Sequence, residues 1–168
     1  GTSATLSPLV PNTTYYFWVR SVCSGSDTSF WMAGPSFITS QIPATIPYVQ
    51  QFTTGSDLGY TNGTQTNKWT YGSATGNTGN SLYISSTNGS TNEYDTSESS
   101  VVHAYRDITI PATTTTATFS FDWKAEGESN WDYLRVWLVP TTYMPSSGNQ
   151  IDAGPGRIQI GNNYNAQT

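Results

Sequence analysis

Alternation of ring-bearing and polar residues limits the fold of this chain more than any other feature. In residues 118–124, Phe119, Phe121 and Trp123 fall on one face of an extended strand, and polar side chains occupy the other. Residues 133–139 repeat the pattern with Leu134, Val136 and Leu138. The chain holds 11 Tyr, 6 Trp and 6 Phe but only 10% charged residues, and no stretch keeps a helical period. We therefore predict an all-β protein.

Further segments show the same strand-like character between loops rich in Gly, Asn, Ser and Thr. The predicted strands are 4–6, 15–22, 36–39, 69–71, 81–85, 100–110, 116–124, 133–139 and 157–160. From the alternation, we expect one core between two antiparallel sheets, formed by Phe119, Phe121, Trp123, Leu134, Val136 and Leu138.

The first part of the chain resembles the end of a fibronectin type III domain. Leu9, Pro11 and Tyr15, followed by aromatic and β-branched residues in period two, are similar to the tyrosine corner before its penultimate strand. Such a domain needs seven strands, whereas residues 1–39 offer three. The resemblance implies the C-terminal part of that domain, with Tyr15, Phe17 and Val19 buried opposite Tyr16, Trp18 and Arg20.

Residues 40–47 contain Pro43 and Pro47, which disfavour helix and stiffen the chain, so we predict a linker there. Residues 48–168 resemble the jelly-roll module of cleaved-adhesin domains in gingipain-type hemagglutinins, and more distantly MAM domains. The stretches that carry this resemblance are 102–108, 119–128, 132–140 and 154–161.

The resemblance implies a partial type III sandwich followed by an incomplete antiparallel jelly-roll sandwich, in cargo of the type IX secretion pathway. The family opens its jelly roll with an acidic-aromatic-acidic strand, but here Gln51, Phe52 and Thr53 stand in its place. The closing strands of the family are expected after Thr168. Other segments of the same polypeptide are therefore expected partners.

Charge and cysteine content restrict the function classes. A net charge of −5 and scattered cations argue against nucleic acid, and no apolar run reaches the length of a membrane span. Cys23 is the single cysteine, so it is either a free thiol or bonded to a residue before Gly1. The composition favours an extracellular location, secreted or on the outer cell surface.

The sequence offers little support for catalysis. His103 is the only histidine, and no nucleophile–base pair or nucleophile elbow is present. We predict a packing or surface role for His103 and a chain that is not an enzyme.

Acidic residues gather around one glycine-containing loop: Asp122, Glu126, Glu128 and Asp132. Three interpretations remain open, namely a solvated turn, a calcium site and a carboxylate pair for glycoside hydrolysis. For calcium, the candidate ligands are Glu126, Glu128 and Asp132, with Asp57 in a second loop. No cofactor is certain, and calcium is the candidate.

The best candidate for ligand contact is the strand face that carries Tyr133, Arg135 and Trp137, with Asp122 or Lys124 as polar neighbours. Aromatic rings stack on sugar faces, and the polar groups can bond to hydroxyls. The alternative is that these rings pack under a loop or against the type III domain.

The sequence also contains three matches to the N-glycosylation pattern, at Asn12, Asn62 and Asn88, which indicate surface loops.

These features lead to one principal functional hypothesis and two alternatives. We expect a non-catalytic adhesion module of a larger bacterial protein, which binds carbohydrate or a glycoprotein surface. The alternatives are an ancillary module of a secreted polysaccharidase or protease, and a structural spacer.

Overall fold

The computed structural model describes residues 3–73 and 79–167, and the described chain is all-β without a helix. It forms two compact units, Gly1–Ala44 and Thr45–Thr168. The boundary between them falls inside the predicted linker 40–47. The described residues form fourteen short strands, β1 to β14.

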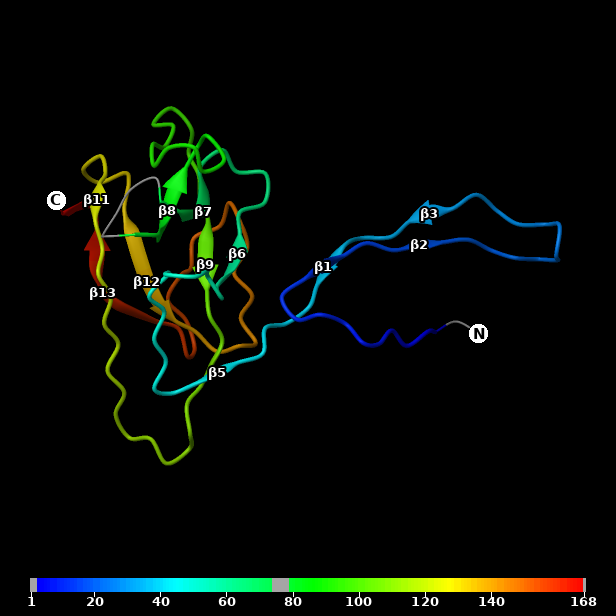
Figure 1. Cartoon of the computed structure of the whole chain (residues 1–168), viewed down its shortest axis with the longest axis horizontal. Helices are drawn as coiled ribbons and strands as arrows, with labels where there is room; N and C mark the ends of the chain where they lie inside the picture. The colour runs from blue at the N-terminus through cyan, green and yellow to red at the C-terminus, as the bar shows by residue number, and fades with distance from the viewer. Residues whose placement is uncertain (1–2, 74–78, 168) are drawn as a thin grey trace. The chain divides into compact units, whose positions relative to one another are not determined.

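The first unit is a narrow antiparallel ribbon, in which chain segments run side by side and turn back at one end (Figure 1). Its strands are β1 (Thr14–Tyr15), β2 (Trp18–Val19), β3 (Met32–Ala33) and β4 (Phe37–Ile38). β1 pairs with β4, and β2 pairs with β3. The predicted strand at 4–6 does not form.

Burial in the ribbon corrects part of the prediction for Tyr15, Phe17 and Val19. Tyr15 is half-buried and stacks on Phe37 with ring centroids 5.8 Å apart. Phe17 is 36% exposed, but Val19 at 54% is as exposed as Trp18 at 56%. A two-stranded ribbon has no second layer of strands. Side chains of β2 and β3 therefore have no apolar layer to pack against on either face.

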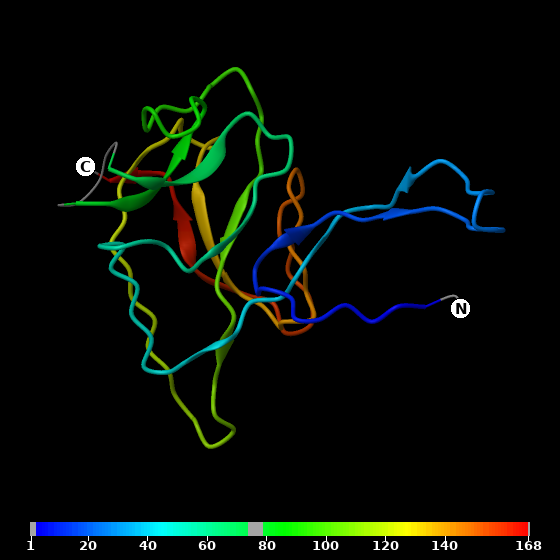
Figure 2. The ribbon, with the colours of Figure 1, turned by 45° about the vertical axis from the view of Figure 1, so that its right-hand side comes forward.

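The second unit consists of short strands that associate in pairs. Figures 1 and 2 both show β12 beside β13. The strands are β5 (Ala44–Thr45), β6 (Gly59–Thr61), β7 (Lys68–Gly72), β8 (Ser81–Ser85), β9 (His103–Tyr105), β10 (Ile108–Thr109), β11 (Ala125–Glu126), β12 (Leu134–Leu138), β13 (Ile158–Tyr164) and β14 (Ala166–Gln167). The pairs are β5–β10, β6–β9, β7–β8, β11–β14 and β12–β13.

Most predicted strands of this unit form, with shifted ends. β8 spans 81–85 as predicted, and β7, β12 and β13 lie on the predicted segments. Segment 100–110 divides into β9 and β10. Segment 116–124 is not a strand, because the described chain supplies no backbone partner along it; only β11 follows. In both views, the chain after β10 first loops away from the strands of this unit and then returns to β11.

The predicted core forms only in part. Phe121, Trp123, Leu134 and Val136 are half-buried, whereas Phe119 is 56% exposed and Leu138 is 48% exposed. The prediction of a single core between two sheets is therefore wrong for Phe119 and Leu138. Each described sheet has two strands, so no broad second sheet covers these two side chains.

An aromatic cluster joins the non-strand segment to the β12–β13 pair. The Tyr164 ring lies 5.4 Å from Phe121 and 5.0 Å from Trp123, both edge-on. Phe119 stacks obliquely on Phe121 at 5.4 Å. Edge-to-face contacts of this kind stabilise aromatic pairs beyond the area they bury. The rings of Phe119, Phe121 and Trp123 thus lie on one side of the chain, although this segment forms no strand.

A buried asparagine holds the loop between β8 and β9. Asn67 is 6% exposed, and its amide nitrogen donates to the carbonyls of Asp95 and Glu98 at 3.0 and 3.2 Å. Its Oδ1 accepts from the Asp95 N–H at 2.7 Å. The side chain therefore satisfies three backbone groups that would otherwise need water.

We predict that Asn67→Asp destabilises the second unit by about 3 kcal/mol, because a carboxylate would face two carbonyl oxygens without a proton to donate. Chemical denaturation measures the change in unfolding free energy. Asn92→Asp is the matched control, since Asn92 is exposed in the same loop. Equal stability of the Asn67→Asp variant and the wild type would contradict this role.

Candidate functional site

The β12–β13 pair presents a polar and aromatic face. In its register, Leu134 pairs with Tyr164, Trp137 with Gln159 and Leu138 with Ile158, with an irregularity between Leu134 and Val136. Because side chains alternate along a strand, the side opposite Leu134 and Leu138 carries a distinct set. This set, which we call the β12–β13 face, consists of Tyr133, Arg135, Trp137, Gln159 and Asn163.

Arg135 lies at the centre of a hydrogen-bond network on this face. Its Nε donates to Asn163 Oδ1 at 2.9 Å, and its NH1 donates to Gln150 Oε1 at 2.8 Å. The guanidinium carbon lies 4.5 Å from the centre of the Tyr133 ring, and Gln150 also donates to the Tyr133 hydroxyl at 3.3 Å. All of these partners are neutral, so the guanidinium is held in place while keeping its full charge.

The loop that supplies Gln150 is itself fixed to the rest of the unit. The Gly148 N–H donates to the Val101 carbonyl at 2.8 Å. His103 Nε2 lies 3.2 Å from the Ser146 carbonyl and 3.0 Å from the Asn149 carbonyl, which requires a proton on that nitrogen. His103 thus has a structural contact with a loop that borders the β12–β13 face.

The structure brings together some of the predicted ligand residues and separates others. Tyr133 and Arg135 touch, and Trp137 is half-buried in the same strand. Asp122 and Lys124 are exposed on the segment before β11, and within the described residues neither takes part in the Arg135 network. Gln150, Gln159 and Asn163 are the polar residues that sequence reasoning missed. Alternation along β13 could have suggested Gln159, but Gln150 comes from a loop.

The acidic loop is arranged as a closed turn. The N–H groups of Trp131 and Asp132 both donate to the Glu128 carbonyl at 3.0 Å. Asp132 Oδ2 accepts from the Tyr94 hydroxyl at 3.0 Å and from the Glu128 N–H at 3.3 Å. Burial and this bond to Asp132 raise the pKa of Tyr94. The Asp132 carboxylate therefore already has protein donors.

Three of the four predicted calcium ligands belong to this loop region, and the fourth, Asp57, lies elsewhere. Glu126 and Glu128 are exposed, and Asp132 is half-buried. Within residues 3–73 and 79–167, no three His, Cys, Asp or Glu side chains are grouped so that they could hold a metal ion.

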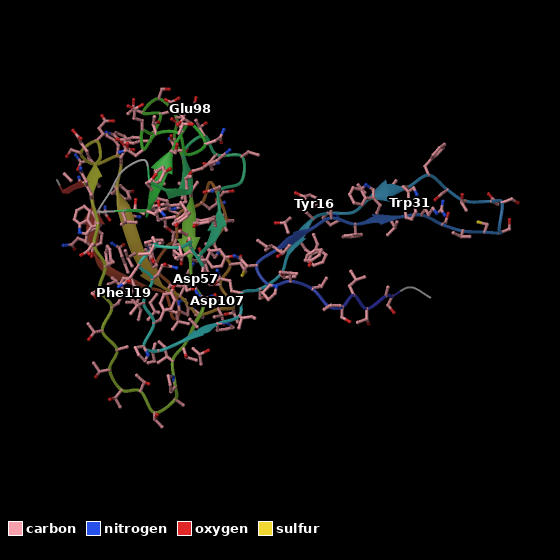
Figure 3. All side chains as sticks on the ribbon, in the orientation of Figure 1. Tyr16, Trp31, Asp57, Glu98, Asp107 and Phe119 are labelled. Carbon is pink, nitrogen blue, oxygen red and sulfur yellow. The ribbon has the colours of Figure 1, made fainter. Side chains whose placement is uncertain are left out.

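Asp57 lies in a separate polar cluster of the second unit, well apart from Glu98 in Figure 3. Its Oδ1 accepts from the Tyr48 hydroxyl at 2.6 Å and from Gln50 Nε2 at 2.8 Å. Its Oδ2 lies 3.1 Å from Arg106 Nε, whose guanidinium is also 5.6 Å from the Tyr48 ring centre. Asp57 thus joins residues 48–50 to the segment between β9 and β10.

The pKa values of the two acids in this cluster, Asp57 and Tyr48, are shifted in opposite directions. Burial alone would raise the pKa of Asp57, but the bonds from Tyr48 and Gln50 and the charge of Arg106 outweigh it and lower that pKa. Burial and the bond to Asp57 raise the pKa of Tyr48 to about 12. The cluster is therefore most stable with Asp57 ionised and Tyr48 neutral.

We predict that Asp57 stabilises the folded chain above the unfolded-state pKa of about 4, and that this stabilisation is lost as the pH falls through the lower folded-state pKa. At neutral pH, Asp57→Asn should cost about 1 kcal/mol, since the carboxylate is half exposed and solvent screens the ion pair. Thermal unfolding across the acidic range measures the effect. Asp152→Asn, at an exposed position, is the control. Parallel pH profiles for wild type and Asp57→Asn would refute the assignment.

Two further features of the sequence analysis are Cys23 and the glycosylation pattern at Asn62. Cys23 is exposed and forms no disulfide within the described residues, and its N–H donates to the Asp27 carbonyl at 2.8 Å. Among the three glycosylation patterns, the Asn62 side chain bonds to both the N–H and the carbonyl of Trp69, at 2.9 and 3.0 Å. Asn62 therefore acts as a bridge between β6 and β7.

Comparison with protein-family models, curated proteins and solved structures finds no match to this chain. In the described residues, nothing forms a helix long and apolar enough to cross a membrane.

Proposed function

We propose that this chain is a non-catalytic carbohydrate- or glycoprotein-binding adhesion module of a larger secreted or cell-surface bacterial protein. The observation that carries the proposal is the β12–β13 face, where Arg135 is held by neutral side chains beside Tyr133 and Trp137. Planar rings next to fixed hydrogen-bond donors suit a pyranose, which offers apolar faces and equatorial hydroxyls.

The proposed domain types receive support from one local contact. The Val10 N–H donates to the Tyr15 hydroxyl at 2.9 Å, five residues along the chain. A tyrosine hydroxyl bonded to backbone a few residues upstream is the geometry of a tyrosine corner. We propose on this basis that residues 1–39 are part of a type III domain. The proposal that residues 48–168 are a jelly-roll module of cleaved-adhesin type rests on the sequence resemblance.

Two alternatives have distinct consequences. If the chain is an ancillary module of a secreted hydrolase, it still binds glycan, and a catalytic domain adjoins it in the longer protein. If it is only a spacer, no glycan binds. Binding measurements therefore separate the spacer from the other two functions.

We predict that Trp137→Ala lowers glycan affinity by tenfold or more at a nearly unchanged melting temperature. Loss of stacking on a half-buried indole corresponds to about 1–3 kcal/mol. Screening the chain on a glycan panel, followed by titration calorimetry on the best ligand, measures the affinity.

Trp131→Ala is the matched control, because Trp131 is 76% exposed in the turn before β12 and lies off the β12–β13 face. It should leave affinity unchanged. If Trp137→Ala unfolds the unit, the ring has a packing role and the proposed face is wrong. Absence of any glycan binding by the wild type would favour the spacer.

A further inference from the structure

Two arginines on the β12–β13 pair keep their charge without a carboxylate partner. Arg135 is bonded to amide oxygens only, as described above. Arg157 lies with its guanidinium carbon 4.9 Å from the centre of the Tyr143 ring, and its NH2 donates weakly to the Ala153 carbonyl at 3.4 Å. Within the described residues, neither arginine forms an ion pair. Both charges are thus available to an anion from solution.

Arg157 is placed in a surface hollow rather than on a free loop. The hollow has a volume of about 320 Å³ and is lined by Pro140, Thr142, Tyr143, Pro155 and Arg157. Two turns form its walls, since the Tyr143 N–H donates to the Pro140 carbonyl at 2.8 Å and the Arg157 N–H to the Gly154 carbonyl at 3.0 Å. The Arg157 guanidinium packs directly against the Gly154 backbone, so a side chain at position 154 would displace the guanidinium from this place.

The hollow continues the β12–β13 face. Leu138 and Ile158 form the last strand pair, so Arg157 comes directly before β13. Alternation puts Arg157 on the same side as Gln159, which pairs with Trp137. Four strand positions at about 3.3 Å each separate the row of Arg157 from that of Arg135, or roughly 13 Å. Trp137 lies between the two cationic rows.

We infer that the ligand of this face is an acidic polysaccharide, in which the carboxylates of uronate residues pair with Arg135 and Arg157 while a sugar ring lies on Trp137. This inference rests on the proposed function and specifies its ligand. Guanidinium groups bind carboxylates through charge-assisted and often bidentate hydrogen bonds. Because the chain carries a net charge of −5, general attraction of polyanions is not expected, and binding depends on this local pair of charges.

The test compares two polymers with the same sugar: polygalacturonate and its fully methyl-esterified form, which carries no charge. We expect the full chain to bind the acidic polymer at least about tenfold more tightly, with affinity falling as salt rises. Arg157→Gln should reduce binding of polygalacturonate about tenfold and leave binding of the ester unchanged. Lys68→Gln on β7 removes the same charge from a different sheet and should change neither.

The outcomes separate this inference from the proposed function. Equal binding of both polymers overturns the acidic ligand but supports a carbohydrate site. Equal binding of polyglutamate and polygalacturonate also overturns it, because the site would then accept any polyanion. If no glycan binds at all, both proposals fail. Should Arg157→Gln lower the melting temperature, the comparison of the two polymers on the wild-type chain still decides the matter.

Discussion

The contact of Tyr164 with Phe121 and Trp123 determines how the second unit is organised. Tyr164 pairs with Leu134 through its backbone, and its ring receives two aromatic side chains from a segment that forms no strand. This fixes which side of β12 and β13 faces the interior. The opposite side carries Arg135 and Trp137, both of which are half-buried. The candidate site therefore depends on an aromatic cluster that it does not touch.

Hydrogen bonds from side chains to the backbone contribute much of the stabilisation that a large apolar core provides in other proteins. Among the described residues, Tyr83 is the one buried hydrophobic side chain, whereas Asn67 and Ser85 are buried and polar. Ser85 Oγ accepts from the N–H groups of Thr87 and Gly89 at 3.1 and 3.0 Å. Such bonds are directional, so they fix loop conformation, but each contributes only about 1 kcal/mol. Stability is thus distributed over many loop contacts.

Local patterns predicted several strands, and they did so best for a pair that is adjacent in sequence. β7 and β8 pair with each other, and β8 was predicted to the residue. Segment 116–124 shows the same alternation, yet a strand also needs a partner backbone, which alternation cannot reveal. The candidate site also contains residues that local alternation predicts and residues that it cannot predict. Period two identified Tyr133, Arg135 and Trp137, but Gln150 and Asn163 reach Arg135 only through the loop fold and the register of β13.

The surroundings of each arginine, rather than its presence, distinguish structural from ligand-binding charges. Arg106 has a 17% exposed side chain and lies 3.1 Å from an Asp57 oxygen, so its charge is already balanced within the fold. Arg135 has equally well-defined partners, but these are amides and a ring, which orient the guanidinium without neutralising it. Fixing a charge beforehand lowers the entropy that a ligand must overcome on binding. Because neutral partners preserve the charge for an incoming anion, Arg135 is suited to recognition and Arg106 to stability.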